Sequence, residues 1–398
     1  MANTLQQDRT NVPGFTTSDD GATRSLMLTD TAARRGADEV SIGPADLSID
    51  GAAGWRVTRT TLRGGKQEGV GLITIDNGRL QIEVIETRGL SLLSAVDGDY
   101  RIGWQSPVTE VIHPVWIDLA ARDGKGWLEG FNELLVRCGL EYAGAPGRDD
   151  EARAGRQADL TLHGRIGNIP ASRVEIVAEI EPPYRVSVRG LVQEHSFAGP
   201  VLDLVAEVST LPGEASFRIV DEVTNLSDSL QEFMLIYHTN FGPPLLGNGS
   251  QLILPARSVA SINSSEPSRL DSYTVCGAPK QGYEEEVYVI EPLPDPYGYV
   301  TALLHDATES IGVSLRWRLE ELPYFTFWKN LASSSEGYVV GLEPGVCYPN
   351  NRRVERQAGR LPVLGAKQSR CFGLEIGILN DAERIGELRR NAHELQSH

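Results

Sequence analysis

The chain has 398 residues, and 37 lysine and arginine residues against 54 aspartate and glutamate residues give a formal net charge of −17 at pH 7. This acidic balance argues against nucleic acid and anionic membrane surfaces as partners, and it suits a protein that handles small molecules. The length allows one large all-β domain or two to three ordinary domains, with a core large enough to need no disulfide or metal.

The cysteines also limit the classes of protein to consider. The four of them are far apart and no pair has C-x-x-C spacing, so neither a zinc ribbon nor a disulfide framework is indicated. The first residues lack the apolar core of a signal peptide, and no run approaches the roughly 18 apolar residues of a membrane span. We therefore expect a cytoplasmic protein.

The N-terminal third begins without regular pattern and then turns into strands. Residues 1–30 are rich in Thr, Asn, Asp, Gly and Gln, which predicts a flexible N-terminal arm or a strap over another surface. From about Val57 the pattern is that of β-strands. Residues 72–76 and 79–85 alternate on either side of Asn77-Gly78, which is a strong hairpin signal.

Residues 103–147 break this rhythm with aromatic residues, prolines and a short helix expected near residues 127–136. A connection this long inside a compact domain is more often functional than accidental. Its aromatic side chains form either a wall that stacks on a sugar or a small core that keeps the long loop folded, and the sequence leaves both open. These residues are Trp104, Trp127, Phe131 and Tyr142.

Strand patterns resume after this segment and continue almost to the end of the chain. The expected strands are residues 174–180, 184–192, 202–208, 216–223, 231–237, 251–254, 286–290, 298–305, 310–317, 324–329, 337–342 and 371–378. So many short strands predict an all-β fold, a large antiparallel sandwich or barrel over residues 31–380 with a few short helices. Residues 381–398 form a tail with helical spacing. Nucleotide-binding, nucleophile-elbow and zincin motifs are absent from the sequence.

One acidic residue has a setting suited to proton transfer. Glu343 follows the β-patterned run 337–340 and precedes Pro344-Gly345, which predicts a turn directly after the carboxylate. A carboxylate held at a strand end is well placed for general acid–base work. The alternative is a solvated loop residue without a task.

Two histidines stand in comparable settings. His163 lies in a glycine-containing loop beside Arg165, and His238 is expected to end an apolar strand just before a Gly/Pro loop. A histidine in such a place reaches into a cleft or bonds to a backbone carbonyl in the core. Its near-neutral pKa makes it a natural partner of a carboxylate in proton transfer.

Three short motifs resemble those of the aldose 1-epimerases, the galactose mutarotase-like proteins. Residues 163–165, HGR, resemble their His-Gly loop, although the arginine is closer to the histidine than is usual there. Residues 237–242, YHTNFG, resemble their second histidine motif. Residues 340–344, VGLEP, fall where these proteins carry a catalytic glutamate. Over residues 72–378 the chain is similar to a DUF4432-like branch of this superfamily.

The resemblance implies a β-supersandwich with a cleft across one sheet, and a reaction in which a sugar ring opens and closes by acid–base catalysis. It implies that Glu343 is the base, that His238 is the acid, and that His163 binds a hydroxyl and stabilises charge. Arg165 and Arg88 would hold sugar oxygens by charge-assisted hydrogen bonds. The other residues of the expected substrate-binding set are Asn240, Trp104, Trp127, Asn350 and Arg352.

We therefore predict an aldose 1-epimerase-like isomerase with a small carbohydrate as substrate, no cofactor and no resident metal. Two alternatives stay open. One is an epimerase, isomerase or lyase that acts on a keto- or otherwise modified sugar with the same Glu/His pair, and the other is a non-catalytic carbohydrate-binding protein. Two histidines and a glutamate can also bind zinc, but no pair has the short spacing typical of a zinc site. A homo-oligomer is compatible with the sequence, which does not identify the sugar.

Overall fold

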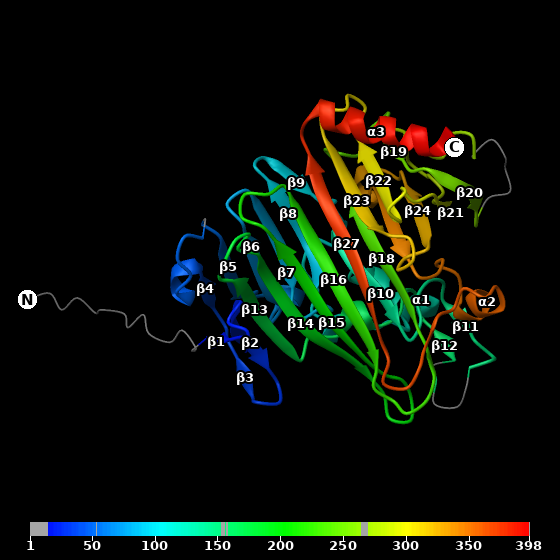
Figure 1. The fold of residues 1–398 in the computed structure, drawn as a ribbon. Helices are drawn as coiled ribbons and strands as arrows, with labels where there is room; N and C mark the ends of the chain where they lie inside the picture. Colours follow the sequence, from blue (N-terminus) through cyan, green and yellow to red (C-terminus); the bar gives the residue numbers. More distant parts are fainter. Residues whose placement is uncertain (1–14, 53, 153–155, 157, 264–269, 398) are drawn as a thin grey trace, which may run out of the picture.

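The structure is a computed structural model that describes residues 15–52, 54–152, 156, 158–263 and 270–397. Within these residues two large antiparallel sheets, sheet A and sheet B, face each other (Figure 1). The all-β prediction is confirmed. Residues 1–14 of the expected N-terminal arm lie outside the described residues.

Sheet A has 11 strands within the described residues. Its spatial order is β1 (Thr16–Thr17), β2 (Thr23–Asp30), β13 (Arg173–Glu179), β14 (Val186–His195), β15 (Val201–Thr210), β16 (Ser216–Asn225), β27 (Ser369–Leu379), β23 (Gly312–Arg318), β22 (Tyr299–His305) and β19 (Gln251–Ile253), with β3 (Arg35–Gly36) paired to β2.

Sheet B has 12 strands in the same part of the chain. Its order is β20 (Ala256–Ser261), β21 (Glu286–Pro292), β24 (Tyr324–Asn330), β25 (Val339–Gly345), β18 (Met234–Phe241), β10 (Leu135–Leu140), β8 (Ser91–Asp97), β7 (Leu80–Ile85), β6 (Gly71–Asp76), β5 (Arg56–Thr61) and β4 (Val40–Ile42), with β9 (Tyr100–Ile102) beside β8. Two small ladders pair β11 (Gly147–Arg148) with β12 (Asp159–Leu160) and β17 (Gln231–Glu232) with β26 (Val363–Leu364).

Helices are few and short among the described residues, apart from the C-terminal one. The α-helices are α1 (Ala121–Gly124), α2 (Arg352–Gln357) and α3 (Ala382–Ser397), and the 3₁₀ turns include η3 (Pro114–Trp116), η4 (Gly126–Glu129) and η5 (Ile166–Asn168). α3 lies along one end of the two sheets (Figure 1), where Ile385 packs on Ile253 and Leu303.

The inner faces of the two sheets meet in one core. β13 to β16 alternate buried and more exposed residues, as expected for strands with one face on a core. Trp317 of β23 stacks on Phe325 of β24 across the interface, with ring centroids 5.6 Å apart. Arg137 of β10 forms a fully buried ion pair with Asp221 of β16 at 2.5 Å, and the Tyr237 hydroxyl donates to the same carboxylate. The sheets are therefore joined by a polar contact as well as by apolar packing.

Two expectations about the first half of the chain are wrong. Residues 23–30 are not a flexible arm: β2 pairs with β13, and Leu26 and Leu28 are fully buried against the core. The end of the helix expected near residues 127–136 is strand β10, which lies between β8 and β18. β10 is buried on every residue, so its sequence shows no alternation.

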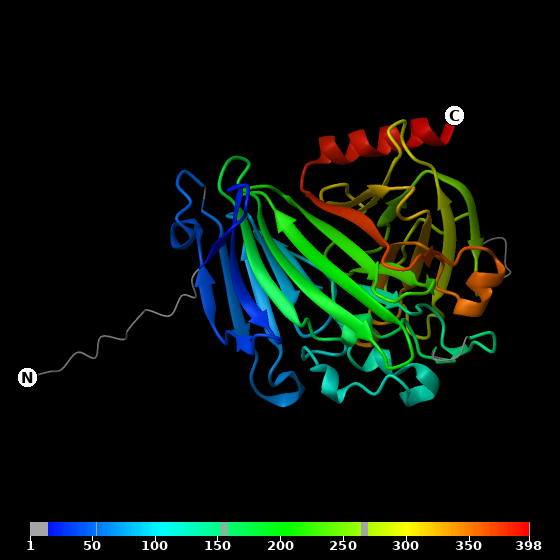
Figure 2. The ribbon, with the colours of Figure 1, turned by 60° about the horizontal axis from the view of Figure 1, so that its bottom comes forward.

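The long segment 103–147 is otherwise irregular where it covers sheet B. We call residues 103–134 the cover segment; it contains η3, α1 and η4 and lies at the bottom of the view in Figure 2. Trp127 and Phe131 of this segment contact the ring of His238 on β18, at centroid distances of 5.9 and 5.3 Å. The cover segment therefore packs on the outer face of sheet B, opposite the face that meets sheet A.

Candidate active site

Glu343 and His238 are cross-strand neighbours in the middle of sheet B. In the antiparallel ladder of β18 and β25, Thr239 is opposite Leu342, so the next pair along the ladder is His238 and Glu343. Side chains alternate between the two faces of a strand, and both residues point to the outer face. Their side chains are buried and meet with Nε2 of His238 3.2 Å from Oε1 of Glu343.

The local structure around both residues differs from the sequence prediction. β18 continues to Phe241, so His238 lies inside the strand and not at its end. Pro344 and Gly345 belong to β25 and do not form a turn. Pro344 has no N–H to donate and is opposite Phe325 of β24. Glu343 is therefore aimed by the register of three strands, because β24 places Thr326 beside it.

His163 reaches the pair from a loop on another part of the chain. Its backbone has φ 60°, and its N–H and C=O are hydrogen bonded to Gly144 and Gly139. Gly164 follows at φ +74°, and a Cβ there would lie 2.1 Å from a backbone oxygen of Tyr142, so only glycine fits. The loop holds the His163 ring 5.2 Å from that of His238. Its Nδ1 is buried without a hydrogen-bond partner.

Aromatic rings surround the two histidines. Trp127 lies 4.6 Å from His163 between centroids, and Trp328 of β24 lies 5.4 Å from His238. With Phe131 they form apolar walls around a polar centre. This is the composition of a small-molecule site, in which apolar and aromatic walls cover the ligand and a few polar groups fix its orientation.

These residues line one pocket of about 350 Å³ on the outer face of sheet B. Its polar lining comes from His163, His238, Glu343, Thr326, Asn263, Glu285 and Lys125, and its apolar lining includes Trp127, Phe131 and Trp328. A larger hollow of about 480 Å³ lies between α3 and sheet A, but no histidine is among the described residues that line it. We assign the site by its chemistry, because only the smaller pocket combines a carboxyl group with imidazoles.

Gly341 leaves the space in which the acid/base pair lies. It is two residues before Glu343 and shares its face of β25, opposite Trp328. A Cβ at this position would lie 2.7 Å from Oε1 of Glu343 and 3.2 Å from Cε1 of His238. The glycine of the GLE motif is therefore a steric requirement of the pair.

Burial shifts the pKa values of the two partners in opposite directions. Desolvation raises the pKa of Glu343 well above its usual value, and the nearby Glu285 raises it further. Desolvation lowers the pKa of His238 to about 4, although its hydrogen bond to Asn240 raises it. Each group thus favours its neutral form. Burial therefore favours Glu343 over His238 as the site of a proton that the pair shares.

His163 is also held in its neutral form. Desolvation lowers its pKa well below the usual value, and the charge of the neighbouring His238 lowers it further. A neutral imidazole presents one N–H donor and one lone pair. His163 can therefore donate to or accept from a ligand hydroxyl in the pocket.

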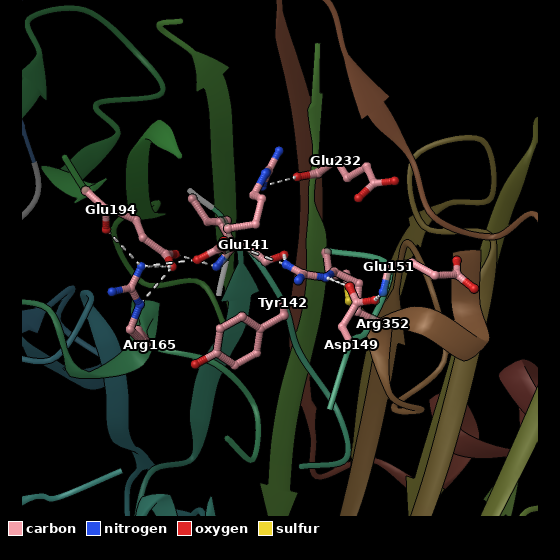
Figure 3. Close-up of polar contacts among 12 residues, drawn as sticks. Glu141, Tyr142, Asp149, Glu151, Arg165, Glu194, Glu232 and Arg352 are labelled. Carbon is pink, nitrogen blue, oxygen red and sulfur yellow. Dashed lines mark hydrogen bonds and ion pairs between the residues drawn. The ribbon is translucent and has the colours of Figure 1, made fainter. Parts of the chain in front are cut away.

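The three arginines expected to bind substrate do not line this pocket. Arg88 is fully buried and pairs with Glu133 at 2.6 Å. Arg165 contacts Glu194 and Glu141, at 3.2 and 3.4 Å, and Figure 3 shows it pointing toward these carboxylates. The physical reason is that a buried guanidinium requires charged partners, and those partners come from distant parts of the chain.

Arg352 belongs to the network of ion pairs around Arg165, because both arginines pair with Glu141. It is fully buried in α2, with Nε 2.8 Å from Oδ2 of Asp149, and Figure 3 shows it between Asp149 and Glu141. Arg356 also reaches Asp149, at 2.9 Å. These two arginines lower the pKa of Asp149 to about 2 against the effect of its burial. Arg352 anchors α2 to the body of the protein and is not a rim residue of the pocket.

The remaining expected substrate contacts divide between the pocket and its supports. Trp127 lines the pocket. Trp104 does not, because it packs against Phe131 at 4.8 Å and its indole N–H donates to the Glu133 carbonyl. Asn350 lies just before α2 and donates to the carboxylate of Glu355 within that helix. Asn240 is fully buried behind His238. Trp127 and Phe131 belong to the hydrophobic core and also line the pocket, so both alternatives left open by the sequence apply to them.

The sequence did not reveal five pocket residues with polar or aromatic side chains. They are Asn263, Glu285, Thr326, Trp328 and Lys125. Alternation along residues 324–330 places Thr326 and Trp328 on one face of a strand. No local pattern shows that this strand lies next to the one with Glu343.

Two further observations concern metals and membranes. No three His, Cys, Asp or Glu side chains in the described part of the chain are grouped so as to hold a metal ion. None of the helices described in the structure has the length and apolar character needed to cross a membrane.

Comparison with known proteins places this geometry in a family. Residues 67–378 match the family described as "Domain of unknown function (DUF4432)". A "putative aldose 1-epimerase" from Klebsiella pneumoniae subsp. pneumoniae has 34% sequence identity and a TM-score of 0.89, and the match covers 94% of this chain and 96% of that one. No curated protein matches the chain in sequence.

Two more distant structures share the fold. A galactose mutarotase-like protein from Clostridium acetobutylicum has 14% identity and a TM-score of 0.57, over 82% of this chain and 98% of that one. A "putative aldose 1-epimerase" from Escherichia coli K12 has 12% identity and a TM-score of 0.54, over 79% and 100%. The chain therefore belongs to the DUF4432 family and has the galactose mutarotase-like sandwich fold.

Proposed function

We propose that this protein is a carbohydrate isomerase of the aldose 1-epimerase type, which interconverts the anomers of a sugar. The observation that carries the proposal is the contact between His238 and Glu343, 3.2 Å apart in an aromatic-walled pocket. The similarity to proteins described as aldose 1-epimerases and mutarotase-like supports it.

Anomer exchange requires one proton donor and one proton acceptor at the same time. A base removes the proton from the anomeric O1–H while an acid protonates the ring oxygen, and the C1–O5 bond breaks to give the open aldehyde. Rotation about C1–C2 presents the other face of the carbonyl, and the reverse proton transfers close the ring. The proton count of the enzyme is unchanged over the cycle, so no cofactor is consumed.

The His238–Glu343 pair meets this requirement because it holds one proton. With Glu343 ionised and His238 protonated, the carboxylate takes the O1 proton and the imidazolium gives one to the ring oxygen, as the family resemblance implies. With the proton on Glu343 the two roles are exchanged. Either form has one donor and one acceptor, and ring opening converts one into the other.

The surrounding residues have supporting tasks in this proposal. Trp127, Phe131 and Trp328 stack on the apolar faces of the sugar and exclude water from the proton transfers. His163, which lines the pocket beside His238, hydrogen bonds to a sugar oxygen and stabilises the charge that develops there. Lys125 and Glu285 meet hydroxyl groups at the mouth of the pocket.

The test is anomer exchange with purified protein and the Glu343→Gln variant. We expect wild-type protein to speed exchange for at least one aldose in a broad panel, followed by polarimetry and by saturation-transfer NMR. Glu343→Gln keeps the size of the side chain but cannot transfer the proton, so we expect a rate lower by roughly 10²- to 10⁴-fold.

The matched control is Glu222→Gln on the exposed face of β16, which should keep wild-type exchange and the same unfolding curve. If no aldose exchanges faster with the wild-type protein, the proposal fails. Product analysis with keto-sugars would then test proton abstraction next to a carbonyl. Binding without turnover that survives Glu343→Gln would indicate a carbohydrate-binding protein.

A further inference from the structure

Asn240 is placed to determine which nitrogen of His238 carries a proton. It lies two residues after His238 on β18 and therefore on the same face of the strand. It is fully buried, and its Oδ1 is 2.7 Å from Nδ1 of His238. Nδ1 is on the side of the ring away from Glu343, which contacts Nε2.

The amide of Asn240 can have only one orientation. Its Nδ2 donates to the backbone carbonyls of Glu133 and His238, at 3.0 and 3.2 Å. Carbonyl oxygens only accept hydrogen bonds, so the NH₂ group must face them and Oδ1 must face the imidazole. Oδ1 is an acceptor, and Nδ1 must therefore be the N–H donor. The neutral ring then carries its lone pair on Nε2.

We propose that Asn240 is a positioning residue that fixes the Nδ1–H tautomer of His238, so that Nε2 is the atom that exchanges protons with Glu343 and the sugar. Its catalytic consequence rests on the proposed function, whereas the tautomer itself does not. With the other tautomer, a neutral His238 would present an N–H to Glu343 and could not accept a proton there.

The support for Asn240 comes from the cover segment. The Glu133 carbonyl that accepts from Asn240 also accepts from the Trp104 indole N–H at 3.0 Å. The Glu133 carboxylate is held by Arg88 at 2.6 Å, with both side chains fully buried. Arg88 is thus linked to the His238 imidazole through Glu133 and Asn240. It supports their positions and does not contact the substrate.

The test uses NMR of protein labelled with ¹⁵N-histidine together with pH profiles of anomer exchange. In the wild type at neutral pH we expect His238 to show a protonated Nδ1 and an unprotonated Nε2. Asn240→Leu has similar volume but no acceptor, so we expect the tautomer preference to be lost. Partners that orient metal-bound histidines typically contribute about 10- to 100-fold, and we expect a loss of kcat of similar size here, with KM nearly unchanged.

Asn240→Asp keeps the acceptor that faces Nδ1, while its second carboxyl oxygen replaces the NH₂ group that faces the Glu133 and His238 carbonyls. We expect that oxygen to hold a proton, because a buried carboxylate oxygen cannot lie against two acceptors, and we expect the Nδ1–H tautomer to persist. The control is Thr239→Val, on the same strand and equally buried but on the opposite face, which should change neither the tautomer nor the profile.

Three results would overturn the inference, and none depends on turnover for its reading. They are an Nε2–H tautomer in the wild type, an unchanged tautomer in Asn240→Leu, and loss of the tautomer in Asn240→Asp. If Asn240→Leu does not fold, the spectra of the wild type and of Asn240→Asp still test whether Asn240 fixes the tautomer. A correct tautomer without anomer exchange would count against the proposed function alone.

Discussion

At the scale of single residues, the site depends on side chains that are small as much as on those that react. Gly341 is the clearest case, because any Cβ there approaches both members of the acid/base pair. A substitution would act without removing a reactive group. It would separate Nε2 of His238 from Oε1 of Glu343, which are now in contact.

We expect Gly341→Ala to lower anomer exchange by at least about 10-fold, since overpacking of this kind moves side chains by fractions of an ångström and proton transfer is sensitive to such shifts. Stability should fall by only roughly 1–3 kcal/mol. The measurement is exchange rate and urea unfolding of the same sample. Gly213→Ala is the comparison for strain without a site effect, because that glycine has φ +77° and open space around its Cβ position. Full activity in Gly341→Ala would show that the pair tolerates displacement.

The residues that sequence reasoning identified are those with a local signal. His163, His238 and Glu343 were found from three motifs in order, and they do converge. Arg88 and Arg165 were misassigned because a sequence does not show which carboxylate a guanidinium will meet. Glu133 is far from Arg88 along the chain, and only the fold brings them together.

At the scale of elements, strand β10 joins the site to the rest of the sandwich. Its outer face carries Val136 beside His238, and its inner face carries Arg137, which pairs with Asp221 of sheet A. A fully buried pair of this kind is costly to break on one side, because the remaining charge has no partner.

We expect Arg137→Met to lower the free energy of unfolding by roughly 3–5 kcal/mol. Asp221→Asn keeps an acceptor for the Tyr237 hydroxyl, so the double variant Arg137→Met/Asp221→Asn should be more stable than Arg137→Met alone. Denaturant unfolding of the wild type, both single variants and the double variant gives the coupling energy. Additive effects would mean that the two side chains do not interact in solution.

The elements also show where sequence reasoning works for strands. The Asn77-Gly78 turn and the alternating runs predicted β6, β7 and β13 to β16 because one face of each meets the core. β10 was missed because both of its faces are covered, and β2 was missed because its neighbours along the chain are polar. Burial on two faces and pairing with a distant strand leave little trace in local composition.

At the scale of the whole molecule, the acid/base pair affects stability as a function of pH. Between about pH 4.5 and 6.5 the unfolded chain carries one proton on His238 and Glu343 together, and so does the folded protein. Above pH 6.5 the unfolded chain holds none, whereas the folded pair keeps its proton until the pH passes the raised pKa of Glu343. The pair's contribution to stability therefore falls as the pH rises toward the raised pKa of Glu343.

Glu343→Gln removes this loss of stability at alkaline pH, because neither the folded nor the unfolded variant binds a proton at the pair above pH 6.5. We expect the difference in unfolding free energy between the variant and the wild type to grow in the variant's favour by up to about 1.4 kcal/mol per pH unit. Urea unfolding between pH 6.5 and 9 measures it, with Glu222→Gln for comparison. A constant difference would show that Glu343 is ionised in the folded protein.

The two walls of the pocket have different structural origins. His238 and Glu343 are set by the register of sheet B, whereas Trp127 and Phe131 come from the irregular cover segment. Substitutions and length changes in residues 105–131 would alter the shape of the pocket and leave in place both the strands that carry the pair and the Glu133 carbonyl that holds Asn240. We therefore expect ligand preference and proton transfer to be separately mutable, so a library confined to residues 105–131 is the natural starting point for changing specificity.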